Sequence, residues 1–156
     1  MKLQCSETLV SDHGYSQTLR RIRGALNEAG LQIAFDVDIA ADICRSTGVQ
    51  LAKSALLGVA CPYQLLEACV ADPAAAVFLP LHIIVAERGN ETEVRLLAPE
   101  ALRAAGLTTA ITIPVHRTLR RVRDALNVAG AHCVEEGQRL VMPPDEGEKH
   151  GDLTRS

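Results

Sequence analysis

The sequence predicts an α+β protein, a two-layer sandwich in which a mixed, mostly antiparallel sheet packs against helices. Apolar and polar residues alternate over 31–37, as expected for a half-buried strand. Over 16–29 the apolar residues instead recur at helical spacing, so that they share one face. A Gly-Asn pair at 89–90 separates two apolar runs and indicates a hairpin, which makes part of the sheet antiparallel.

Strands and helices are expected in the order β-α-β-α-β-α-β-β-α between residues 2 and 106. The expected strands are 2–11, 31–37, 55–60, 79–87 and 93–97. The expected helices are 16–29, 39–44, 62–70 and 99–106. Ser16 and Asp38 are predicted to cap helices. Pro62 suits the first position of a helix, and Gly30 suits the positive φ that follows one.

A segment near the C-terminus repeats a segment near the N-terminus. Residues 118–130 match residues 18–30 at ten of thirteen positions. Two copies are too few for a solenoid, which needs at least three. The elements expected of the second copy are a helix at 116–129 and strands at 110–114, 131–135 and 138–142.

The repeat divides the chain into three predicted parts. Residues 1–107 form the α+β domain, and 108–142 form a β-α-β(β) extension that copies its first strand-helix-strand unit. This extension either lengthens the sheet or, because a partial unit exposes apolar surface, forms a dimer interface. The polar, charged composition of 143–156 predicts a disordered tail.

The composition limits the possible partners and compartment. A net charge of −3 and only four aromatic residues, two Tyr and two Phe, argue against nucleic acid as a partner. No window has the roughly 18 apolar residues that cross a bilayer, so no membrane association is expected. Five cysteines without a C-x-x-C pair, and no apolar run after Lys2, predict reduced thiols in the cytoplasm.

The order of several short motifs resembles a known family. The motifs are Ala29-Gly30, Asp36-Val37-Asp38, Gly58-Val59-Ala60-Cys61-Pro62, Ala71-Asp72-Pro73 and Phe78-Leu79-Pro80. From about residue 7 to residue 106 this order resembles the domain of unknown function 302 family. The resemblance implies a small α+β domain that pairs as a homodimer, and it supplies no established activity. The family often has an Asn between the Cys and the Pro, and a second Cys where this chain has Leu81.

Cys61 is the first candidate site residue. It lies where a predicted strand ends and a helix begins, and the free N–H groups and dipole of a helix N-terminus favour a thiolate. A thiolate can act as a nucleophile, a persulfide carrier or a metal ligand. The plainer interpretation is a small buried residue packed beside Pro62, because free Cys is among the most buried residue types.

His82 is the second candidate. If its strand neighbours the one that ends at Cys61, the imidazole approaches the thiol, and the pair suits thiol activation or binding of a soft metal. Cys-Pro also occurs in haem-binding motifs, so haem is the other cofactor considered for Cys61 and His82. A histidine on the sheet surface, with one hydrogen bond, is the plainer interpretation.

Other polar residues are better explained structurally. The repeated arginines, Arg20, Arg21, Arg23, Arg120, Arg121 and Arg123, could bind phosphate near helix N-termini, but a solvated helix face is favoured. Asp36 and Asp38 share a strand face, and a capping function explains Asp38. His116 and His132 replace Ser16 and Gln32 of the first copy and are interpreted as structural or surface residues. No common hydrolase or nucleotide-binding motif occurs, so no catalytic residue is assigned.

Three functional hypotheses follow. The first is a homodimeric module that binds a small ligand, metal or cofactor, haem included, in a cleft near Cys61 and His82. The second is a thiol-based sulfur carrier or redox protein that uses Cys61. The third is a structural or assembly protein in which the C-terminal repeat joins chains.

Overall fold

The computed structural model describes residues 5–134 and contains the expected alternation of strands and helices. Its strands are β1 (Ser6–Ser11), β2 (Gln32–Asp38), β3 (Ser54–Ala60), β4 (Leu81–Arg88), β5 (Glu91–Leu97) and β6 (His132–Cys133). Its α-helices are α1 (Tyr15–Glu28), α2 (Ile39–Thr47), α3 (Pro62–Ala71), α4 (Pro99–Ala104) and α5 (Thr109–Val128). A 3₁₀ helix, η1 (Pro73–Val77), follows α3. Within 5–134 no helix has the length and apolar content to cross a membrane.

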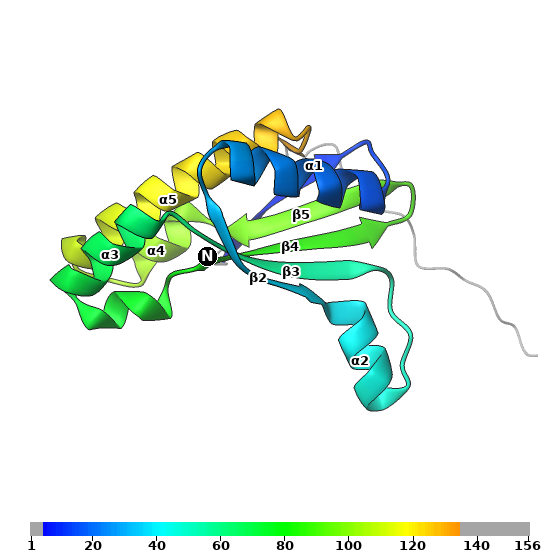
Figure 1. Ribbon diagram of the computed structural model, residues 1–156, viewed down its shortest axis with the longest axis horizontal. Helices are drawn as coiled ribbons and strands as arrows, with labels where there is room; N and C mark the ends of the chain where they lie inside the picture. The colour runs from blue at the N-terminus through cyan, green and yellow to red at the C-terminus, as the bar shows by residue number, and fades with distance from the viewer. Residues whose placement is uncertain (1–4, 135–156) are drawn as a thin grey trace, which may run out of the picture.

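The described strands form one sheet in the order β2-β3-β4-β5-β1-β6. Every neighbouring pair is antiparallel, so the predicted α+β class is confirmed. β1 is the first strand in the chain, but its two neighbours, β5 and β6, both come from the second half. In Figure 1, α1, α3 and α5 lie together on one side of the sheet, whereas α2 extends away from the end of β2.

The core lies between the sheet and the helices. Strand β4 shows the division, because Leu81, Ile83 and Val85 are buried while His82 and Ile84 on the opposite face are exposed. The largest fully buried side chains come from both layers: Leu9, Leu57, Val59, Ile83, Val85 and Val94 from strands, and Ile22, Leu26, Val115, Leu119, Val122 and Leu126 from helices. Full burial of such a side chain contributes about 1.5–3 kcal/mol, so the packing of α1 and α5 accounts for much of the stability.

The helix boundaries follow most of the capping predictions. The Asp38 carboxylate accepts a hydrogen bond from the Ala41 N–H at 2.9 Å, and Gly30 has a φ of 70°. Pro62 occupies the first turn of α3 as expected. Ser16 is not a cap, because α1 begins at Tyr15 with Gly14 before it. The turn is held instead by Thr18, whose hydroxyl donates to the His13 carbonyl at 3.0 Å.

The predicted strand at 110–114 is wrong, because these residues belong to α5. Ile111, Val115, Leu119 and Val122 recur at helical spacing and are buried, so burial of a long apolar face outweighs the strand preference of the β-branched residues. Pro114 lacks an N–H and therefore removes one hydrogen bond from the second turn of the helix.

The repeated helices pack against each other within one chain. Arg21 in α1 donates from Nε to the Ala129 carbonyl at 3.0 Å, and Arg121 in α5 donates from Nη2 to the Ala29 carbonyl at 2.6 Å. Each arginine thus satisfies a carbonyl at the C-terminal end of the other helix, and the two helices run antiparallel. After α5, β6 joins the edge of the sheet beside β1. The segments predicted at 138–142 and 143–156 lie outside the described residues.

Candidate functional site

Cys61 lies at the junction of β3 and α3, as the sequence predicted, and its side chain is buried on the helix side of the sheet. The residue is 4% exposed and occupies the N-cap position of α3. Arg121 of α5 donates from Nη1 to the Cys61 Sγ at 2.9 Å. The same guanidinium holds the Ala29 carbonyl, so one side chain connects the thiol to the end of α1.

A guanidinium and the start of a helix lie beside the Cys61 sulfur. The Arg121 guanidinium is permanently positive, and no side chain caps the free N–H groups at the start of α3. A cation and a helix N-terminus are two features typical of reactive thiols. The sequence did not predict the contact with Arg121, because the two residues are 60 positions apart and no local pattern connects them.

His82 lies on the face of the sheet that the helices leave uncovered. Its ring makes an edge-to-face contact with Phe35, with centroids 5.6 Å apart and ring planes at 67°. Phe35 and His82 are both paired with Gly58, which lies on the strand between them. A Cβ at Gly58 would lie 2.3 Å from the Phe35 ring, so the absence of a side chain there lets Phe35 cross β3 and fix the imidazole.

The structure does not bring Cys61 and His82 into one cleft. The thiol faces Arg121 on the helix side, and the imidazole contacts Phe35 on the opposite face. The difference follows from strand geometry, since successive side chains alternate between faces and His82 pairs with Gly58, three positions before Cys61. In the part of the chain that the structure describes, no group of three or more His, Cys, Asp and Glu residues is placed to hold a metal ion.

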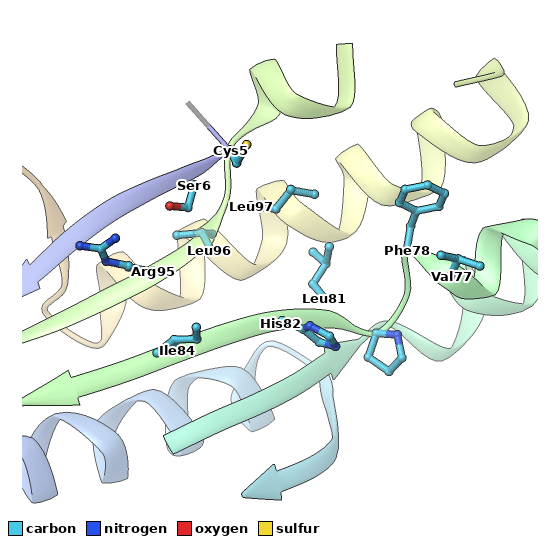
Figure 2. Close-up of a pocket in the computed structure, with 11 residues that line it drawn as sticks. Cys5, Ser6, Val77, Phe78, Leu81, His82, Ile84, Arg95, Leu96 and Leu97 are labelled. Carbon is cyan, nitrogen blue, oxygen red and sulfur yellow. The ribbon is translucent and has the colours of Figure 1, made fainter. Parts of the chain in front are cut away.

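A cavity of about 460 Å³ adjoins His82 at the end of the sheet (Figure 2). Its lining is Cys5, Ser6, Val77, Phe78, Pro80, Leu81, His82, Ile84, Arg95, Leu96 and Leu97. Most of this wall is apolar. Figure 2 shows His82 and Ile84 along one strand, Leu96 and Leu97 on its neighbour, and Phe78 with Val77 beyond the strand end.

The polar groups of this cavity are few and held in place. Arg95 donates from Nε to the Glu93 carboxylate at 2.5 Å, which fixes the guanidinium beside the cavity. The contact with Phe35 restricts His82. An apolar cavity with a small number of oriented polar groups is the usual form of a small-molecule site. Sequence analysis identified His82 as a site residue but missed Phe78, which it used only as part of a family motif, and Arg95, which lies in no recognisable motif.

Several of the repeated arginines make contacts that explain them structurally. Arg23 pairs with Asp36 at 2.7 Å, and Arg123 pairs with Glu7 at 2.7 Å. These partners lie on strands and not on the arginines' own helices. Asp36 is therefore engaged in an ion pair, and Asp38 is engaged as a helix cap.

Comparison with known proteins agrees with the motif order. No curated protein matches the chain. The crystal structure of an uncharacterized conserved protein DUF302 from Bacillus stearothermophilus superposes with a TM-score of 0.72 at 16% identity, over 81% of this chain and 99% of that chain. At this identity the similarity shows the fold.

The family match is broader than the motifs alone indicated. The family model of the domain of unknown function DUF302 matches residues 7–129. This range passes residue 106, where the motif resemblance ended, and includes α5 with the second copy of the repeated helix. The expected resemblance is confirmed, and the chain belongs to the family of the domain of unknown function DUF302.

Proposed function

We propose that this protein binds a small, largely apolar ligand in the cavity beside His82. The observation that carries the proposal is the cavity of about 460 Å³, whose apolar wall contains one imidazole held in place by Phe35. A ligand of this kind would bury apolar surface against Phe78 and Leu97 while His82 supplied a hydrogen bond or a metal–ligand bond.

Haem is one member of this ligand class that can be tested directly, because histidine is a common axial ligand of haem iron. Native mass spectrometry and an absorption spectrum of freshly purified protein would first report any bound species. Addition of haem should then give a shifted Soret band that the His82→Ala variant loses. His116→Ala is the matched control, because His116 lies on α5, away from this cavity. An equal spectrum from the H82A variant would contradict haem ligation by His82.

The proposed ligand-binding form is a homodimer joined through α3. Tyr63, Leu66 and Val70 recur at helical spacing and are 83%, 62% and 77% exposed. Beyond this apolar stripe, Val77, on η1, is 82% exposed and also lines the cavity. A symmetric pair of copies would bury the stripe of each on the other. If it also covered Val77, the pairing would close off that part of the cavity wall.

Sedimentation velocity tests the homodimer. Leu66→Arg should convert a dimer to a monomer, because it places a charge within the stripe. Val128→Arg is the matched control, since Val128 is 73% exposed on α5 and outside the stripe. A dimer in the L66R variant would exclude the stripe as its interface, and a monomeric natural protein would exclude the homodimer itself.

The second candidate function is thiol chemistry at Cys61, favoured by the 2.9 Å contact with Arg121. In a sulfur carrier, the Cys61 thiolate would attack the outer sulfur of a persulfide donor, RSSH. The products would be a Cys61 persulfide and the thiolate RS⁻. The nearby cation would stabilise the attacking thiolate.

Selective labelling tests this chemistry. At pH 6, iodoacetamide should label Cys61 faster than Cys5 or Cys133, although these two are exposed and Cys61 is buried. Peptide mass spectrometry would give the rate for each thiol. Slower labelling of Cys61 than of the exposed thiols would show that its burial dominates and would exclude it as the reactive group.

A further inference from the structure

A second cavity, on the helix side, has a strongly basic lining. It encloses about 540 Å³ and is lined by Gln64 of α3 and by His116, Arg117, Arg120 and Arg121 of α5. The four α5 residues lie on one helix face at positions i, i+1, i+4 and i+5. Within the described range 5–134, no acidic side chain lines the cavity.

Of the three guanidinium groups that line this cavity, two have partners among the described residues and the third, that of Arg120, has none. Arg121 already donates to Cys61 and Ala29, and Arg117 reaches the Glu67 carboxylate at 3.3 Å. Arg120 has no hydrogen-bond or ion-pair partner among residues 5–134. Like charges three and four positions apart on a helix repel each other. This repulsion raises the free energy of the anion-free protein, and a bound anion would relieve it.

The repeat shows that the basic face is specific to the second copy. Arg20 and Arg21 match Arg120 and Arg121, but the first copy has Ser16 and Gln17 where the second has His116 and Arg117. The first copy therefore has two of the four basic groups. Its residues do not line the basic cavity.

The opposite wall of the cavity is also suited to an anion. Gln64 lies in the first turn of α3, so the end of the helix that carries free N–H groups borders the cavity. The Gln64 side-chain oxygen accepts from the Thr118 hydroxyl at 2.7 Å, which fixes the amide against α5.

We propose that this basic cavity binds a small dianionic oxyanion, either free phosphate or the phosphate group of a small molecule. Arg120 would provide the principal contact, because guanidinium groups bind phosphate oxygens in pairs. Arg121 would add positive charge at one side, and His116 would add a hydrogen-bonding group. This site is separate from the His82 cavity, with which it shares no lining residue.

The test is a titration followed by the arginine Nε–H signals in ¹H–¹⁵N NMR spectra, at constant ionic strength with sodium chloride as the balancing salt. One arm uses inorganic phosphate, and the other uses glycerol 3-phosphate. The Arg120 and Arg121 signals should shift saturably in at least one arm. Saturation by both identifies free phosphate as sufficient, and saturation by glycerol 3-phosphate alone identifies a phosphate monoester.

Arg120→Gln should weaken binding about tenfold or more, because it removes a charge-assisted hydrogen bond. Arg20→Gln is the matched control, since it makes the same change at the equivalent position of the first copy and should leave the affinity unchanged. No saturable shift in either arm, or equal weakening by the R120Q and R20Q variants, would overturn the proposal.

Discussion

The two copies of the repeated helix have nearly the same sequence but different surroundings. α1 has 14 residues and begins at Tyr15, directly after a short turn. α5 has 20 residues and begins at Thr109, six positions before Val115, the residue that corresponds to Tyr15. Where their sequences agree, each copy closes the end of the other through Arg21 or Arg121. Just before the repeated segment, at 116 and 117, the second copy has basic residues that the first lacks, and these line the basic cavity. The residues that the two copies share thus hold the two helices together, and the residues that differ give each helix a different exposed surface.

The largest expected effect tests whether the two copies contribute equally to the core. Leu26 and its counterpart Leu126 are both 0% exposed. Leu26→Ala and Leu126→Ala should each lower the free energy of unfolding by about 2–5 kcal/mol, through lost burial and a residual cavity. Urea denaturation of both variants gives the comparison. A loss below about 1 kcal/mol for L126A alone would mean that the second copy is peripheral to the core.

A smaller effect tests the reciprocal arginine contacts. Arg21→Gln and Arg121→Gln should each cost about 1–2 kcal/mol, because each removes a charged donor from a helix-end carbonyl. Only R121Q should also change the rate at which iodoacetamide labels Cys61, since only Arg121 contacts that sulfur. Denaturation and peptide mass spectrometry separate the two effects. Equal labelling rates in both variants would show that Arg121 has no influence on the thiol.

The smallest effect concerns the strand partners of the two copies. Arg23 pairs with the half-exposed Asp36, and Arg123 pairs with the mostly buried Glu7. Burial raises the pKa of the Glu7 carboxyl above its ordinary 4.5, although the Arg123 charge acts in the opposite direction. The unfolded chain therefore releases this proton at lower pH than the folded protein, so the contribution of Glu7 to stability falls as the pH rises from 4.5 through the raised value.

Glu7→Gln cannot lose this proton, and it should therefore gain stability relative to the natural protein across the same pH range. Urea denaturation at several pH values between 4 and 7 would measure the difference. Asp36→Asn is the matched change at the other copy and should cost no more than about 1 kcal/mol. A stability difference between the E7Q variant and the natural protein that is independent of pH would contradict the raised pKa of Glu7.

The sequence predicted the fold well because most elements carry their signal locally. The alternation over 31–37, the Asp38 cap and the Gly-Asn turn all appear in the structure as β2, the start of α2 and the β4–β5 hairpin. The N-terminal half of α5 was mistaken for a strand because its β-branched residues indicate a strand locally. Its helical conformation depends on burial of Ile111 and Val115 against the rest of the core.

The candidate sites could be predicted only in part, because they depend on contacts between distant segments. Cys61 and His82 were identified by residue type and position, but whether they meet depends on strand register and on the face that each side chain takes. The contact between Arg121 and Cys61 joins α5 to α3. The one sequence signal that could have drawn attention to Arg121 is that the repeat has an arginine at this position in both copies, as Arg21 and Arg121.

The position of β1 has a consequence for the order in which the protein folds during synthesis. β1 is made before the other described strands, but its neighbours in the sheet are formed by residues 91–97 and 132–133. β2, β3 and β4 are consecutive neighbours and can pair as soon as residue 88 is available. β1 can therefore pair on one side only after residue 97 and on the other only after residue 133, so its apolar residues depend on other protection until then.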